Sequence, residues 1–313
     1  MNNIQAIEFI KMKRSAMSQQ KLNRSANRVL QIPPYPLATE RVYGKNMIAI
    51  SQGFIDSIDN VLNTFTDKHF DSISADIDSL WAQMKEEYER YYGTTIYRSG
   101  NIGSMLFTIA GNILGMDSAF MQKQMSVIAG EPFIIDTPWW PSVRDLWAQE
   151  NYNLISSMGN DYITSLNKLL LCSVSTGMSK DELALSIAKL QKGMTSYHAK
   201  LIARDQVGKL NALVQKEQAM YIGINSYYWH TARDEKVRGA PGRYARAIPS
   251  HYVMEGLLCT WEDNAVYSDD LGKTWKKKTA LMELNQVGMA IQCRCLASLS
   301  WNEFVQNLDK EVA

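Results

Sequence analysis

The chain has 313 residues, of which 46% are apolar and 21% are charged, and its formal net charge is +1. This composition is typical of a globular protein and excludes an intrinsically disordered chain. The near-zero net charge excludes binding to nucleic acid through an overall positive field, and the length predicts two domains or one domain with a large helical extension.

Residues 1–38 are predicted to form a basic arm followed by a proline-rich linker, because prolines fix φ and exclude a helix there. A basic arm beside the acidic segment 56–90 suits docking to another subunit or to a phosphate backbone, and two solvated helix faces are the alternative. Charged residues before and at Lys11 argue against a signal peptide, and the 4 cysteines indicate a reducing compartment.

Residues 39–138 are predicted to be a helical region of unknown role. The uncharged segment 100–116 leans apolar but is shorter than the about 20 residues that span a bilayer, so we expect a buried helix or loop in a soluble protein. The segment 131–141 is rich in proline and contains a tryptophan pair. It is expected to connect this region to a second domain, residues 139–313.

Three helices are predicted at the start of the second domain. Apolar residues over 142–177 follow the spacing of one face of a long helix. Ser179 and Glu182 form a capping box, which predicts the start of a short helix through Leu190. A third helix is predicted over about 196–222.

After Gly223 the apolar pattern changes to a period of two, which predicts a strand over 226–232 and further strands over 257–261 and 288–295. The segment 268–275 resembles the Asp-box of sialidase-type propellers. Because it occurs once, it is predicted to be a tight hairpin with a carboxylate capping the turn and a tryptophan packed beneath. The predicted fold class is α+β: a mainly helical N-terminal part, then a small β-rich module with a long basic loop and a hairpin.

Four short motifs follow one another in the second half of the chain. They are Ala203-Arg204-Asp205-Gln206, Trp229-x-x-x-x-Asp234-x-x-Val237-Arg238, Ser250-His251-x-x-Met254-Glu255-Gly256 and Cys293-Arg294-Cys295. Their order and spacing resemble the phage head morphogenesis family, the minor head proteins similar to phage Mu protein F. The resemblance covers about half of the chain, 147–297, and departs from the family pattern at Asp205-Gln206, at Val287 and in the insertion 239–249.

The resemblance implies a non-enzymatic, structural virion component. Such a protein would contact the portal or the major capsid protein and would lie near packaged double-stranded DNA. It would be found in the head interior or at the portal vertex, and in the host cytoplasm during assembly. The motif residues that the resemblance assigns to one structural network are Arg204, Asp205, Trp229, Asp234, Arg238, His251 and Gly256.

Residues His251, Cys259, Cys293 and Cys295 offer four nitrogen and sulfur ligands of the kind that bind zinc in structural sites. Against a zinc site, Cys-x-Cys in a strand would point its two side chains to opposite faces. The rival interpretation is that His251 hydrogen-bonds Asp234 or a backbone carbonyl and ties the long loop to the sheet.

Flexible basic residues in the loop 233–246 and at 276–278 suit contact with DNA phosphates or with a protein partner. They are Arg233, Lys236, Arg243, Arg246, Lys276, Lys277 and Lys278. Solvated loops are the alternative interpretation.

Two other function classes stay open. A zinc-stabilised nucleic-acid-binding protein would use the same loop and ligands without a role in a virion. A hydrolase or toxin acting through His251 and its acidic neighbours would need a nucleophile and oxyanion donors. The sequence contains no Gly-x-Ser-x-Gly, His-Glu-x-x-His or phosphate-loop motif.

Overall fold

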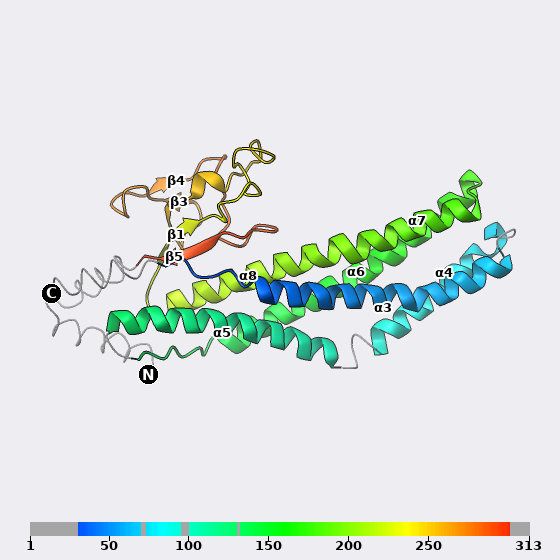
Figure 1. The fold of residues 1–313 in the computed structure, drawn as a ribbon, viewed down its shortest axis with the longest axis horizontal. Helices are drawn as coiled ribbons and strands as arrows, with labels where there is room; N and C mark the ends of the chain where they lie inside the picture. The colour runs from blue at the N-terminus through cyan, green and yellow to red at the C-terminus, as the bar shows by residue number, and fades with distance from the viewer. Residues whose placement is uncertain (1–30, 70–72, 95–99, 130–131, 301–313) are drawn as a thin grey trace. The chain divides into compact units, whose positions relative to one another are not determined.

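The computed structural model describes residues 31–69, 73–94, 100–129 and 132–300, so most of the predicted basic arm lies outside the described residues. Long helices come first and a small sheet module follows, which confirms the predicted α+β class (Figure 1). The helical elements are α3 Leu37–His69, α4 Ile73–Tyr91, α5 Asn101–Ala129, α6 Trp140–Thr176, α7 Lys180–Gly193, the π-helix η3 Met194–His198, α8 Ala199–Tyr221 and the 3₁₀-helix η4 Tyr252–Met254. The strands are β1 Ser226–His230, β2 Leu258–Thr260, β3 Val266–Tyr267, β4 Lys276–Lys277 and β5 Leu296–Leu299.

Contacts between residues divide the chain into two units that interleave in the sequence. Unit 1 comprises 1–36, 111–143 and 207–313, and unit 2 comprises 37–110 and 144–206. The domain boundary predicted near residue 138 falls inside unit 1, and the predicted division into successive domains stays a prediction. In the described parts of the chain, no helix combines the length and the hydropathy that crossing a membrane requires.

Unit 2 is built from long helices with an apolar core. Phe54 on α3 stacks on Tyr88 of α4, with ring centroids 5.6 Å apart, and Leu166 and Leu170 of α6 are fully buried. These residues recur at helical spacing, so each helix presents one apolar face to its neighbours. The region predicted as helical over 39–138 contains α3, α4 and α5, and the apolar segment that was expected to be a buried helix or loop lies in α5 from Asn101 onward.

The helix boundaries differ from the predictions in two places. Helix α6 begins at Trp140, two residues earlier than predicted, and it ends at Thr176. The predicted break between Leu190 and Ser196 is absent, because α7 continues through the π-helix η3 into α8. Gly193 keeps right-handed helical angles, so nothing interrupts the chain there. The capping box of Ser179 and Glu182 is confirmed, with both of its hydrogen bonds formed.

Unit 1 contains the sheet module, whose three-stranded antiparallel sheet has the order β2-β1-β5. Tyr227 of β1 pairs with Cys259 of β2, and Trp229 of β1 pairs with Ala297 of β5. Trp229 and Tyr227 are among the largest fully buried side chains of the described residues. The predicted strands over 226–232 and 257–261 are therefore confirmed in shortened form.

Two predictions about the module are wrong. Residues 288–295 are not a strand, because left-handed backbone at Gly288 and Gln292 turns the chain, and β5 begins only at Leu296. The hairpin predicted over 268–275 does form between β3 and β4, and Asp270 accepts hydrogen bonds from the backbone and hydroxyl of Thr274 at 2.9 and 2.6 Å. Its tryptophan does not pack beneath the turn, since Trp275 is 43% exposed.

Candidate metal centre and motif network

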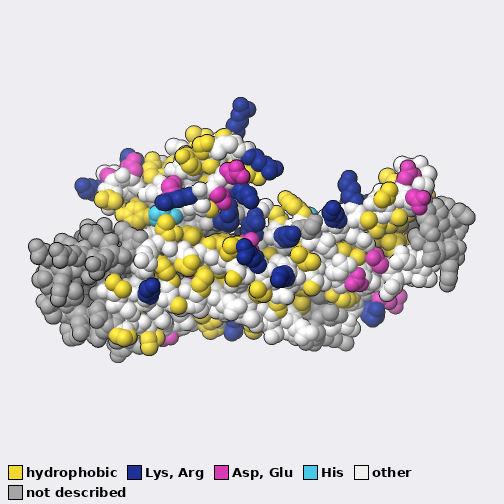
Figure 2. All heavy atoms as spheres, viewed as in Figure 1, with side chains coloured by type: hydrophobic (Ala, Val, Ile, Leu, Met, Phe, Trp, Pro, Cys, Tyr) yellow, Lys and Arg dark blue, Asp and Glu magenta, His cyan; other side chains and the backbone are white. Residues whose placement is uncertain are grey.

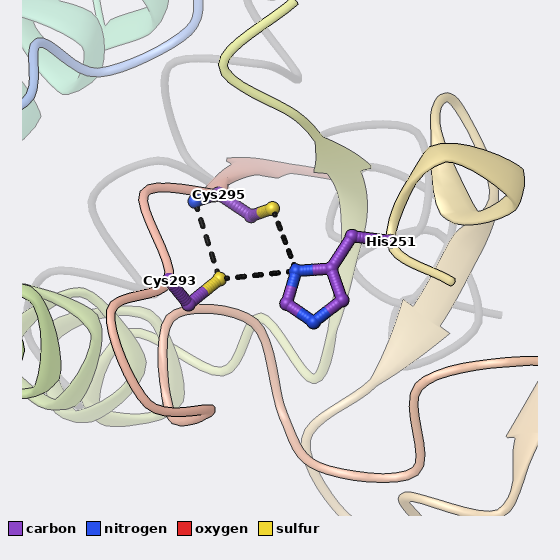
Figure 3. Close-up of side chains that lie close together, drawn as sticks. All are labelled: His251, Cys293 and Cys295. Atoms are coloured by element: carbon purple, nitrogen blue, oxygen red, sulfur yellow. Dashed lines mark hydrogen bonds between the residues drawn. The ribbon is translucent and has the colours of Figure 1, made fainter. Parts of the chain in front are cut away.

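Three metal-capable side chains converge in the core of the module. The Sγ atoms of Cys293 and Cys295 lie 3.5 and 3.4 Å from Nδ1 of His251 (Figure 3). All three residues are buried, and their potential ligand atoms lie within 4.8 Å of one another. In Figure 3 the histidine comes from the segment before η4, while both cysteines come from the loop that enters β5. This His/Cys/Cys group has the side chains to hold a metal ion.

The Cys-x-Cys pair converges because it does not lie in a strand. Gln292 has a φ of 58°, and Cys293 N–H donates to the carbonyl of Ala290 at 2.9 Å, which closes a tight turn just before the pair. The backbone N–H of Cys295 then donates to Sγ of Cys293 at 3.3 Å. The expectation that the two thiols point to opposite faces is therefore wrong, since strand alternation does not apply in a turn.

Glu283 is the partner that fixes the histidine. Its carboxylate lies 2.9 Å from Nε2 of His251, and both side chains are almost completely buried. Glu283 also accepts hydrogen bonds from the backbone and side-chain amides of Asn285, at 2.9 and 2.8 Å. The predicted partner Asp234 is wrong, because Asp234 pairs instead with Arg294 at 2.6 Å.

An isolated β-bridge explains how Glu283 meets His251. Ser250 pairs with Met282 in parallel, and Ser250 N–H donates to the carbonyl of Leu281 at 2.7 Å. This bridge sets the residues that follow, His251 and Glu283, beside each other. Sequence reasoning missed Glu283 because the surrounding loop has neither a periodic pattern nor a motif.

The charges of the centre depend on one another. Burial alone would lower the pKa of His251, but contacts with Cys293 and Glu283 raise it to about 9. Burial would raise the pKa of Glu283, but His251 and Asn285 lower it to about 2. The hydrogen bond from Cys295, together with His251, holds the pKa of Cys293 well below its usual range. All three directions favour the charged forms: an imidazolium at His251 beside a carboxylate at Glu283 and a thiolate at Cys293.

Two further side chains form the wall of the centre. The Trp229 ring stands edge-on to His251, with centroids 5.8 Å apart, and its buried Nε1 has no hydrogen-bond partner among the described residues. Lys278 Nζ lies 5.7 Å from the Trp229 ring centroid and donates to the carbonyl of Glu283 at 3.0 Å. Burial lowers the pKa of Lys278. Lys278 was predicted to contact DNA, but it lies against this core.

Cys259 does not join the cluster. It lies on β2 opposite Tyr227, and its thiol is outside the group formed by His251, Cys293 and Cys295. Burial raises the pKa of Cys259 to about 11, which is the state of an ordinary buried thiol. Three of the four predicted metal ligands are therefore brought together and the fourth is not.

The other motif residues of the module are joined by short hydrogen bonds. His251 N–H donates to the carbonyl of Arg238 at 3.0 Å, and Gly256 N–H donates to the carbonyl of Trp229 at 2.8 Å. The Arg238 guanidinium donates to the carbonyl of Ile291 at 3.1 Å, next to the cysteine turn. The network thus links the three motifs of unit 1. Arg204 and Asp205 belong to unit 2, where Arg204 pairs with Glu40 at 3.3 Å.

Glu255 organises the start of the basic loop. It accepts hydrogen bonds from the backbone and hydroxyl of Thr231 at 2.6 and 2.7 Å and pairs with Arg233 at 2.8 Å. Partial burial would raise its pKa, but hydrogen bonds from Thr231, Arg233 and His230 lower it to about 2. Arg233, which was predicted to contact DNA or a protein partner, pairs with Glu255 and so helps to fix the loop.

The remaining predicted basic contacts divide into paired and exposed side chains. Lys276 pairs with Asp269 at 2.8 Å. Lys236, Lys277, Arg243 and Arg246 are exposed, and the Arg243 guanidinium lies 5.4 Å from the centroid of the Tyr244 ring. Figure 2 shows Lys and Arg side chains projecting from the surface of the module. These exposed residues are the ones available for a partner.

The chain is similar to a known protein over part of its length. No family model matches it, and no solved structure matches it. An uncharacterized protein from Haemophilus influenzae is 34% identical over 88 residues, which are 28% of this chain and 20% of that relative. The match thus spans about a fifth of the relative's length.

Proposed function

We propose that this chain is a minor head protein of a phage, a structural component that binds the portal or the major capsid protein. The observation that carries the proposal is the convergence of three separate motifs on one core. Trp229, His251 and the Cys-x-Cys pair are distant in sequence, yet they contact one another or share the same hydrogen-bond network. Motifs that are far apart in the sequence and meet in one core are best explained as parts of one module. This supports the resemblance to the phage head morphogenesis family.

The arrangement favours a structural role over catalysis. His251 is 3% exposed, its Nε2 lies against Glu283 and its Nδ1 lies against the two thiols. A general base must reach the proton that it removes, and this imidazole has no ring nitrogen directed at solvent. The same geometry speaks against a hydrolase or toxin acting through His251.

In this proposal the His/Cys/Cys centre holds a zinc ion with a structural role. Thiolates and imidazole are ligands that zinc prefers, and calcium and magnesium take oxygen ligands instead. A bound ion would join the segment at His251 to the loop at Cys293 and Cys295, and so would hold the basic loop on the sheet. The exposed Lys236, Arg243 and Arg246 would then face packaged DNA or the portal.

The experiment is peptide mass spectrometry of density-purified phage particles, with the soluble fraction of the same lysate as the control. We expect the chain in the particles at low copy number beside the portal protein. Its presence only in the soluble fraction would contradict a virion component.

The zinc-stabilised nucleic-acid-binding protein is the competing proposal, and the exposed basic residues favour it. In that case the purified chain binds duplex DNA, and the affinity falls steeply with salt. Replacing Lys236, Arg243 and Arg246 by alanine would lower the salt slope by about three, since each phosphate contact contributes about 0.9. The matched control is Lys276→Ala, which removes a lysine already paired with Asp269.

A further inference from the structure

We infer that His251, Cys293 and Cys295 are three ligands of one zinc ion and that Glu283 is the positioning residue that fixes the imidazole for it. The inference deepens the zinc assignment of the proposed function and does not depend on a role in the virion. The protein supplies two sulfur atoms and one nitrogen from the described residues, and a light-atom ligand completes the shell.

The spacing of the ligand atoms fits a tetrahedral zinc ion. Bond lengths of about 2.3 Å to sulfur and about 2.0–2.1 Å to nitrogen place tetrahedral nitrogen and sulfur ligands about 3.6 Å apart. The observed separations from Nδ1 of His251 are 3.5 Å to Cys293 and 3.4 Å to Cys295. The two edges of the tetrahedron that join the histidine nitrogen to the sulfur atoms are therefore already at the length that the metal requires.

Hydrogen bonding alone accounts poorly for the same arrangement. With Nε2 directed at Glu283, Nδ1 can take part in one strong hydrogen bond: it donates when the ring is charged and accepts when the ring is neutral. Both sulfur atoms nevertheless lie within 3.5 Å of Nδ1. The second sulfur therefore needs another reason to be there. A cation held between the three atoms supplies that reason.

Glu283 gives the second line of support, because it is placed as metal sites place a carboxylate behind a histidine. A carboxylate on the far ring nitrogen fixes the tautomer and the ring orientation and makes the ligating nitrogen more basic. Glu283 is 2% exposed and is itself held by Asn285, so it is a rigid support. A carboxylate that served only as an ion-pair partner would have no need of a cluster of thiols on the other side of the ring.

Trp229 gives a third. Its Nε1–H is buried and has no hydrogen-bond partner among the described residues. An unpaired buried N–H costs free energy unless an acceptor faces it. The Trp229 ring stands beside His251, and a metal-bound thiolate in this centre would be such an acceptor, whereas a neutral thiol is a weak one.

The experiment uses the full chain purified without chelator. We expect elemental analysis to find one zinc per chain, and X-ray absorption to find two sulfur atoms, one imidazole nitrogen and one further light atom around it. The absence of zinc, or a shell of oxygen atoms, would overturn the inference. A shell with three sulfur atoms would overturn the ligand assignment, since it would require a sulfur ligand besides Cys293 and Cys295.

Variants test the ligands one at a time. Cys293→Ser and Cys295→Ser should lose the metal, and the matched control Cys259→Ser, also a buried cysteine, should keep it. Glu283→Ala should weaken zinc affinity about 10–100-fold in competition with a chelator, while the exposed Glu262→Ala should not.

If the cysteine variants fail to fold, the X-ray absorption spectrum of the unchanged chain still decides between the outcomes. Zinc in a chain that is absent from particles would reject the virion role and keep this centre.

Discussion

The helical unit 2 and the sheet module of unit 1 are stabilised in different ways. Helices α3 and α6 have 33 and 37 residues, whereas the strands of the module have between 2 and 5. Helical segments distribute their stability over many apolar contacts. The module has little regular structure between residues 231 and 295, and a few buried polar side chains hold its loops. A change to one polar group should therefore affect the module far more than a change to one apolar group affects the helices.

Removal of the metal should have the largest effect on stability, and it should affect the sheet module much more than the helices. Structural zinc contributes on the order of 10 kcal/mol to small metal-dependent folds. With a chelator, we expect the fluorescence of the buried Trp229 and Trp261 to change while most of the helical circular dichroism remains. Loss of both signals together would show that the helices depend on the same centre.

Asp117 lies on the unit 1 part of α5 and should give the next largest effect. Burial raises its pKa to about 8, and its hydrogen bond from Gln215 at 3.2 Å lowers it less. In the unfolded chain this carboxyl ionises at about pH 4. The contribution of Asp117 to the free energy of unfolding therefore falls as the pH rises from about 4 to about 8, and it is constant outside that window.

The variant Asp117→Asn removes the ionisation and should raise the free energy of unfolding near neutral pH by a few kcal/mol. Urea unfolding of both proteins at about pH 5 and about pH 8 measures the difference, which should grow with pH. A variant that is less stable than the parent at the higher pH would mean that Asp117 is a paired carboxylate.

Gly159 on α6 tests the packing of unit 2. A Cβ atom there would lie 2.7 Å from the Tyr88 ring and 2.9 Å from the Phe54 ring. Gly159→Val should therefore cost about 1–3 kcal/mol by overpacking. Thermal unfolding followed at the helical signal measures it, and the matched control Gly111→Val has no neighbour within 4 Å of its new Cβ. Equal losses in the two variants would point to helix propensity instead of packing.

Ser179→Ala should give the smallest effect, about 1 kcal/mol, because it removes a side-chain cap from α7. Chemical denaturation of unit 2 measures the loss. Ser175→Ala is the control, since Ser175 is an exposed serine that bonds only within its own helix turn. An unchanged midpoint for Ser179→Ala would show that helix continuity through η3 already secures the start of α7.

Local signals in the sequence predicted the features that a few neighbouring residues determine. Helical periodicity located the helices, the Ser179–Glu182 capping box located the start of α7, and the turn residues at 268–275 located the hairpin. They failed at 191–195, where nothing in the spacing distinguishes a continuous helix with a π-turn from a break. They also failed at 288–295, where a run that suits a strand turns twice.

For the candidate metal centre, the sequence determined the ligand types and their scarcity, because histidine and cysteine are chemically distinct wherever they lie. The tertiary structure alone decided that His251, Cys293 and Cys295 meet, that Cys259 stays apart and that Glu283 stands behind the imidazole. His251 is more than 30 positions from Glu283 and from both cysteines, so no short window of sequence contains both partners of these contacts. The two cysteines in turn converge because of one left-handed turn at Gln292. Both features follow from the packing of the whole module.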